Sequence, residues 1–393
     1  MSAEISTVPA RLRLIVITVS VVLLVAEFVA LYVGVPQALR GASRFRQLYN
    51  AGYMVRVGNG AQLYDPEANA RFQNEVTGQV DRIEVFNAPA YEALLLAPFS
   101  LLTYRIAYFA FFAINLVLLG FSIRALQPFL PQLENVWPRL PAAVFLCFFP
   151  STLALIDGHD SIILLALMAA SAVSFYRERD FRAGVFLGLA LFQIQLVLPI
   201  ALLFLLWQKW KIIAGFFLTG VAVTALSLII AGPRGLLASI HNSVLFNSSL
   251  GAPASTIPNL RCLLHSVASS IASPGKLDVV WVIGSVLLLA WAATRTPNFA
   301  LAILATLLVS SQGTICDAIL LIIPIAMVLD ARLTVTSGTS RLWSRNFAGM
   351  LFVAPAVCFF TRSTYCALAL LMVGLLMPLR YTSADILPSE SAA

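Results

Sequence analysis

Apolar runs of about 20 residues recur along this chain, and such a run is long enough to cross a bilayer core of ~30 Å as a helix. The first run extends from Leu12 to Pro36, with Arg11 directly before it and Arg13 at its second position. Of the 393 residues, 60% are hydrophobic and 11% are charged, and that charged share is about half the value of a soluble domain. The sequence therefore predicts an all-α protein, a polytopic bundle of about 10 to 12 transmembrane helices.

The first apolar run is expected to stay in the membrane with the N-terminus in the cytoplasm. It is too long for the core of a signal peptide, and no small-residue cleavage site follows it. Most Lys and Arg residues lie in short connections, so the net charge of +7 is interpreted as a topology signal and not as a nucleic-acid surface. We therefore predict a multi-pass protein of the plasma (inner) membrane, with no nucleic-acid partner.

One membrane domain is expected over residues 1–380, followed by a disordered tail at 381–393. Two sizeable polar connections interrupt it, at 37–88 and at 232–276. The first mixes aromatic residues with charges, so we expect it to fold on the extracytoplasmic membrane surface. Asp65, followed by proline and glutamate, predicts a helix start there, because an acceptor side chain caps the helix and both following residues favour its first turn.

Two basic clusters flank one apolar run, 183–207, although both clusters are expected in the cytoplasm. They are Arg177, Arg179 and Arg182 before the run and Lys209 and Lys211 after it. A hairpin of two half-helices that meet at Gln193 and Gln195 would place both clusters on one side. A single tilted span would leave one cluster outside. The hairpin is the preferred interpretation.

Polar residues among apolar runs are costly to bury, which makes them candidates for a functional site. Four groups meet this description: Arg44, Arg46, Gln47, Tyr49, Asn50 and Tyr53 in the first connection; Asp157, His159 and Asp160; Gln193 and Gln195; and Gln312 with Asp317. Each group also has a plain structural interpretation, as a surface helix, a capped connection, a helix–helix hydrogen bond or a loop.

Metal binding is not expected. His159 with its two neighbouring acids offers three ligands within four residues, and such ligands rarely point at one centre. The five cysteines show no metal-ligand spacing and are interpreted as small core residues. We predict no metal, no disulfide and no cofactor. Arg261, in a compact polar turn, is a candidate contact for a phosphate.

Taken in order, several segments resemble one family. The chain is similar to bacterial integral-membrane glycosyltransferases of the GT-C class, specifically glycosyltransferase family 87, which includes polyprenyl-phosphate-mannose-dependent mannosyltransferases. The resemblance covers about 12–379, and the segments that carry it are FRQLYNAGYMVRVGNGAQLYD (45–65), FNAPAYEALLLAPFSLLTYRIAYFAFFAINLVLL (86–119), GHDSIILLALMAAS (158–171), RDFRAGVFLGLALFQIQLVLPIALLFLLWQKWKIIAG (179–215), GPRGL (232–236), IPNLR (257–261) and the polar break at 310–317.

The resemblance implies transfer of a hexose, such as mannose, from a polyprenyl-phosphate donor in the membrane lipid to a glycan or glycolipid acceptor outside the cytoplasm. It implies inversion at the sugar carbon, basic side chains for the phosphate and a carboxylate that deprotonates the acceptor hydroxyl. On this basis three sets are assigned: Asp65, Asp160 and Asp317 as catalytic carboxylates; Arg44, Arg46, Tyr49, Gln193, Gln195 and Arg261 for the donor; and Asn50, Tyr53, His159 and Gln312 for the rest of the pocket.

The family pattern places an acid, the presumed base, where this chain has Arg44. An arginine stays protonated and cannot act as a general base. Three hypotheses therefore stay open. The first is an active enzyme whose base is another carboxylate, with Asp65, Asp81, Glu84 and Asp160 as candidates. The second is a catalytically degraded relative that binds a polyprenyl-phosphate lipid or assists another enzyme. The third is a transporter with a midplane site at the glutamine pair.

Overall fold

The computed structural model describes residues 10–40, 43–77, 86–245, 259–270, 273–311, 314–334, 339–361 and 366–379. Every regular element in these ranges is a helix, which confirms the prediction of an all-α bundle. The expected tail at 381–393 lies outside the described residues, as do three candidate site residues, Asp81, Glu84 and Gln312.

Helices long and apolar enough to cross a membrane form the frame of the molecule. Within the described ranges there are five such segments by length and composition: α1 (Ala10–Ala38), α5 (Tyr104–Leu126) with its 3₁₀ extension, α10 (Asp180–Leu189) joined to α11 (Ile194–Leu206), α12 (Trp210–Leu245) and α14 (Pro274–Ala293). The pair α7 (Leu140–Leu146) and α8 (Phe149–Asp157), bent by 52°, can supply a sixth.

Further apolar helices complete the bundle, some buried in its interior and others with large apolar side chains such as Phe360 and Leu370 exposed. They are α9 (Ser161–Tyr176), α15 (Phe299–Val309), α16 (Ile322–Thr334), α17 (Thr339–Thr361) and α18 (Cys366–Leu379). Every residue of α15 is buried. A helix that is apolar all round fits this central position, because no face of it has to meet water.

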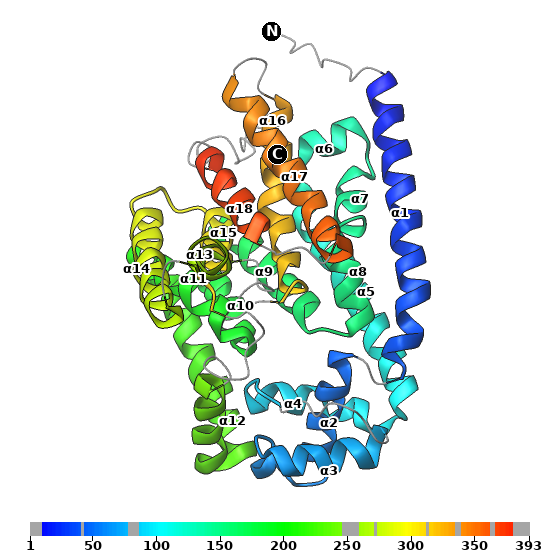
Figure 1. Ribbon diagram of the computed structural model, residues 1–393, viewed down its shortest axis with the longest axis vertical. Coiled ribbons are helices and arrows are strands. Elements are labelled where there is room, and N and C mark those ends of the chain that lie inside the picture. The colour runs from blue at the N-terminus through cyan, green and yellow to red at the C-terminus, as the bar shows by residue number, and fades with distance from the viewer. Residues whose placement is uncertain are drawn as a thin grey trace.

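A layer of short helices covers one end of the bundle (Figure 1). This cap layer consists of α2 (Arg44–Arg56), α3 (Pro66–Thr77) and α4 (Ala90–Leu96). At Gly52, α2 comes so close to the end of α4 that an added Cβ would lie 2.7 Å from the Leu96 backbone. The predicted helix start is confirmed, since the Glu67 amide donates to Asp65 Oδ1 at 2.9 Å. The first polar connection is therefore folded onto the bundle.

The second polar connection begins later than expected. The sequence placed its start at Gly232, but α12 continues to Leu245 through a kink at that glycine. Gly232 has φ 69°, which glycine adopts without steric cost, and the proline that follows is suited to a first helical turn. The next helix, α13 (Leu260–Ala268), begins at Asn259, whose side chain accepts a hydrogen bond from the Cys262 amide at 2.8 Å.

α10 and α11 fold back on each other around a 3₁₀ turn, η4 (Ala190–Gln193). A single helix of this length would separate Asp180 from Lys209 by roughly 40 Å. Instead, Lys209 Nζ lies 3.9 Å from Asp180 Oδ2 and over the ring of Phe175, in the last turn of α9. The length and apolarity of 180–206 would suit one span, but these contacts show the hairpin. Both basic clusters therefore lie at the same end of the bundle.

Candidate functional site

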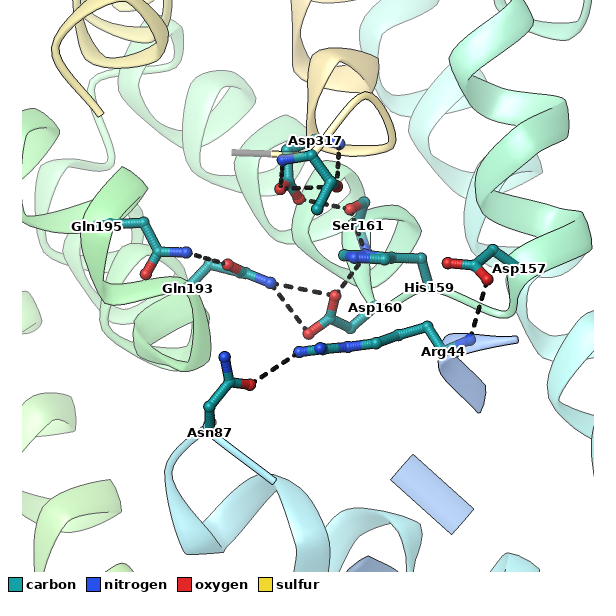
Figure 2. A network of polar contacts seen from close by, with 10 residues as sticks. Arg44, Asn87, Asp157, His159, Asp160, Ser161, Gln193, Gln195 and Asp317 are labelled. Carbon is teal, nitrogen blue, oxygen red and sulfur yellow. Dashed lines mark hydrogen bonds and ion pairs between the residues drawn. The ribbon is translucent and has the colours of Figure 1, made fainter. Parts of the chain in front are cut away.

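A polar cluster lies where the cap layer meets the bundle (Figure 2). Five parts of the chain contribute to it. They are the start of α2, the segment before α4, the connection between α8 and α9, the tip of the α10–α11 hairpin, and the 3₁₀ turn η7 (Asp317–Leu321), which follows the polar break after α15. Segments far apart in the sequence therefore place polar side chains at one depth of the bundle.

Arg44 extends from the first residue of α2 into this cluster. Its backbone amide donates to Asp157 Oδ1 at 2.9 Å, which anchors the helix start to the end of α8. Its Nη2 donates to Asn87 Oδ1 at 3.0 Å. Its Nε is buried and has no hydrogen-bond partner within the described residues. The guanidinium is thus held in place at its tip by Asn87, with one buried donor unsatisfied.

Asp160 is the carboxylate at the centre of the cluster and is 1% exposed. Its Oδ1 lies 2.7 Å from His159 Nδ1, and Gln193 Nε2 donates to both of its oxygens at 3.1 Å. Gln195 Nε2 in turn donates to Gln193 Oε1 at 2.7 Å, which fixes the orientation of that amide. The tip of the hairpin therefore supplies the donors that satisfy a buried acid.

The electrostatics favour charge separation between Asp160 and His159. Burial alone would raise the pKa of Asp160, but the neighbouring imidazolium, its hydrogen bond and Arg44 hold that pKa below its usual value. Burial would lower the pKa of His159, and the adjacent carboxylate raises it overall. The pair therefore behaves as a buried carboxylate–imidazolium pair.

Asp317 is connected to this pair through a serine. Ser161 Oγ donates to Asp317 Oδ1 at 2.6 Å and lies 2.7 Å from His159 Nδ1. The other oxygen of Asp317 accepts from the Thr314 amide at 2.8 Å and from its hydroxyl at 3.0 Å. Because both oxygens have donors, Asp317 holds η7 against the start of α9.

A cavity of about 540 Å³ opens beside the cluster. Its polar end is formed by Arg44, Asn87, Gln193, Gln195 and Ser311. Its walls are largely apolar, and their residues include Leu191, Phe192, Val223, Ala231 and Leu236. Among the described residues, no carboxylate lines this cavity. Asp160 is hydrogen-bonded to Gln193, which lines the cavity, but does not line it itself.

The structure brings six of the predicted site residues together and places six others elsewhere. Arg44, His159, Asp160, Gln193, Gln195 and Asp317 meet in the cluster. The remaining described candidates do not line the cavity: Arg46, Tyr49, Asn50, Tyr53, Asp65 and Arg261.

Those six have other surroundings. Arg46 is buried within the cap layer. Tyr49 donates to the Leu102 carbonyl at 2.7 Å, and Asn50 donates to Asn69 Oδ1 at 3.4 Å. Tyr53 and Asp65 lie near the surface, where Tyr53 donates to Glu75 at 3.2 Å and Asp65 caps α3. Arg261, on α13, pairs with Asp278, on α14, at 2.8 Å.

Sequence reasoning missed Glu92 and Asn87. Glu92, on α4, is 4% exposed and interacts with Asp160 and Arg44. Burial, followed by the charge of Asp160, raises its pKa well above the usual value. It is a lone acid in the apolar segment AYEALLL, so the rule that selected the glutamine pair would also have selected it.

These features define an integral membrane protein with a polar site between a surface cap and a helical bundle. The model of glycosyltransferase family 87 matches residues 89–324, which is more than half of the chain, and the chain belongs to this family. It is thus a glycosyltransferase of the membrane type. The matched range contains α4, the α10–α11 hairpin and η7, whereas Arg44 precedes it. Neither a curated protein sequence nor a solved structure matches the chain.

Proposed function

We propose that this protein transfers a hexose, such as mannose, from a polyprenyl-phosphate donor to a hydroxyl group of a glycan or glycolipid at the outer face of the membrane. The observation that carries the proposal is the cavity, which joins an arginine-bearing polar end to apolar walls of α12 and the hairpin. A lipid-linked sugar phosphate has the same division into an anionic head and a hydrocarbon tail.

In this proposal Arg44 binds the phosphate of the donor. A guanidinium forms charge-assisted hydrogen bonds to phosphate oxygens, and these are stronger than neutral ones. The Asn87 contact and the backbone anchor at Asp157 hold Arg44 at the polar end of the cavity. Gln193 and Gln195 lie beside it on the cavity wall. The Gln193 amide is bonded to Asp160 and Gln195, so in this proposal the Gln195 side chain contacts the sugar hydroxyls.

The proposed transfer is a single displacement. The acceptor oxygen forms a bond to C1 of the hexose from the face opposite the phosphate, and the bond between C1 and the phosphate oxygen breaks. The polyprenyl phosphate leaves with that electron pair and gains one negative charge, which Arg44 stabilises. The hydroxyl proton passes to Asp160, our candidate base, since this carboxylate contacts Gln193 and lies near Arg44. No metal or nucleotide is required.

A second candidate function is lipid binding without turnover. Two observations favour it: no carboxylate among the described residues lines the cavity, and Asp160 has a lowered pKa, which weakens it as a base. Such a protein would bind a polyprenyl-phosphate lipid or assist another enzyme.

Purified protein in lipid nanodiscs, supplied with labelled polyprenyl-phosphate mannose and cell-envelope glycolipids, would separate the two functions. We expect sugar transfer or donor hydrolysis by the wild type, its loss in Asp160→Asn, and its retention in the matched control Asp65→Asn. Donor binding without turnover in the wild type would support the second function. Absence of donor binding would contradict both, and turnover by Asp160→Asn would show that the base is another group.

A further inference from the structure

Glu92 is a buried acid that has no part in the proposed transfer. It projects from α4 toward the connection between α8 and α9, and it interacts with Asp160 and Arg44. Neither of its oxygens has a hydrogen-bond donor among the described residues. Asp160, by contrast, is surrounded by donors from His159 and Gln193. Two acids in contact therefore have very different surroundings.

This difference indicates which of the two acids carries the proton. An ionised carboxylate buried without donors is strongly destabilising, and two adjacent carboxylates cannot both be charged at low cost. Asp160 has the hydrogen-bond donors that stabilise a charge. Glu92 has no donor among the described residues, and its neighbour, the Asp160 carboxylate, is an acceptor. The stable arrangement is an ionised Asp160 and a neutral Glu92 whose hydroxyl points at the Asp160 carboxylate.

The charge state of Glu92 also determines how strongly Arg44 can attract a phosphate. With Glu92 neutral, the carboxylates near Arg44 already have other partners: Asp160 is paired with His159 and Gln193, and Asp157 accepts from the Arg44 backbone amide. An ionised Glu92 would add a second negative charge close to the same guanidinium and would compete with any phosphate that binds there. It would also repel that phosphate directly, in a site where low dielectric strengthens the repulsion.

We propose that Glu92 is a positioning residue of the transfer site: as a neutral acid it donates a hydrogen bond to Asp160 and leaves the charge of Arg44 to the phosphate of the donor. The inference rests on the proposed function and deepens it, because it sets the condition under which the lipid phosphate binds. Binding of the donor should weaken as pH rises and Glu92 loses its proton.

The other groups around Glu92 can be distinguished from it. Arg44 faces it from α2, and Asp160 with His159 from the connection between α8 and α9. Tyr64 interacts with it from the segment before α3, and Tyr91 is its neighbour on α4. α12 packs against α4 and contributes the uncharged Ser227, whose hydroxyl accepts from the Tyr91 amide at 3.1 Å. Titration of His159 or a tyrosine would persist when Glu92 is replaced.

The test is equilibrium binding of a labelled methyl diester of polyprenyl phosphate to the full chain in nanodiscs, from mildly acidic to alkaline pH. A diester keeps one negative charge throughout, unlike a phosphate monoester, whose second pKa is about 6. Its lack of sugar makes the readout independent of the hexose. The proteins are the wild type, Glu92→Gln and the matched control Glu75→Gln, which alters an exposed acid of α3.

We expect the wild type and Glu75→Gln to lose at least about tenfold in affinity across this range, the effect of roughly 1.4 kcal/mol. Glu92→Gln, which stays neutral and can still donate to Asp160, should vary less than about twofold. If Glu92→Gln does not fold, Glu92→Met should show the same flat profile. Wild-type pH dependence retained in the Glu92 variants, or a flat wild-type profile, would overturn the inference while the proposed function stands. Absence of binding by every protein would overturn the proposed function itself.

Discussion

The site has an arginine where the family pattern would suggest an acid. Arg44 occupies that position, and an acid on α4, Glu92, interacts with it. The cluster around Asp160 therefore contains both an arginine and an imidazole, and the polar end of the neighbouring cavity, which Arg44 lines, can hold an anion that an acid at position 44 would repel. At the level of single residues, the basic groups of this site therefore favour the binding of a phosphate.

Replacing Arg44 tests that conclusion directly. Arg44→Gln removes a charge-assisted contact to the phosphate, and such contacts contribute about 1.5–3 kcal/mol. Affinity for a polyprenyl phosphodiester should therefore fall about 10- to 100-fold, measured by equilibrium binding in nanodiscs. The control is Arg71→Gln, an exposed arginine of α3 that contacts Gln62 at 3.3 Å. Equal affinities for Arg44→Gln and the wild type would remove Arg44 from the donor site.

At the scale of elements, the α10–α11 hairpin places the glutamine pair, and its position depends on the close approach of α10 and α12. Gly184 lies against the Ile212 carbonyl, and Gly215 against the Phe181 carbonyl. At Gly188, an added Cβ would lie 2.7 Å from Thr219 Cβ. Small residues let helix backbones approach in membranes, where packing replaces the hydrophobic effect as the driving force. A side chain at any of these positions would push the hairpin away from α12.

Gly184→Ala should therefore destabilise the protein although alanine favours helix over glycine by about 1 kcal/mol. The added methyl group meets backbone of α12 that cannot rotate away, and overpacking of this kind costs about 1–3 kcal/mol. The measurement is the thermal unfolding midpoint in detergent. Gly120→Ala, in an exposed position of α5 with nothing within 4 Å of the added Cβ, should be neutral or slightly stabilising. A higher midpoint for Gly184→Ala would contradict the close packing.

Asp330 joins α16 to α6 (Pro131–Val136) by accepting hydrogen bonds from the Gln132 and Leu133 amides, both at 2.8 Å. Burial raises its pKa from 3.8 to about 6, despite these bonds. The folded protein therefore holds the proton more tightly than the unfolded chain, and stability falls as pH rises from about 4 through about 6. The total change is at most about 3 kcal/mol.

Asp330→Asn should remove this dependence, because asparagine stays neutral and its oxygen can still accept both bonds. Unfolding midpoints compared at pH values on either side of this window should fall in the wild type and stay level in the variant. Asp65→Asn, at an exposed cap, should behave like the wild type. A parallel decline in Asp330→Asn would assign the pH dependence to another group.

For the whole molecule, the all-α class and the hairpin could be predicted from the sequence, because the length of apolar runs and the clusters of basic residues are local signals. Half of the candidate site could be predicted because its polar residues stand out among apolar runs. The boundary at Gly232 did not follow, since a kinked helix and a loop share the same Gly-Pro pair. Glu92 was overlooked because its significance arises only when α4 is packed against the connection that bears Asp160. Asp65 and Arg261 were selected by type, but their partners are local and lie away from the cavity.

The arrangement of both basic clusters at one end predicts the orientation of the molecule. Arg177 follows Tyr176, which lies against Phe129 beyond the far end of α5, whereas Tyr104 at the start of α5 bonds to Ser43 beside the cap. The cap layer lies at one end of the bundle (Figure 1), and these contacts place the basic connections at the opposite end. Because such clusters favour the cytoplasm, the cap layer is expected outside it.

Cysteine labelling in intact cells tests this orientation. Glu75→Cys, in the exposed part of α3, should react with a membrane-impermeant maleimide, and Arg177→Cys should react only after the membrane is opened. The background is Cys366→Ser, since the other four native cysteines are buried. The opposite pattern would place the cavity on the cytoplasmic side. The donor would then have to carry its sugar on the inner leaflet, and an acceptor outside the cytoplasm would be excluded.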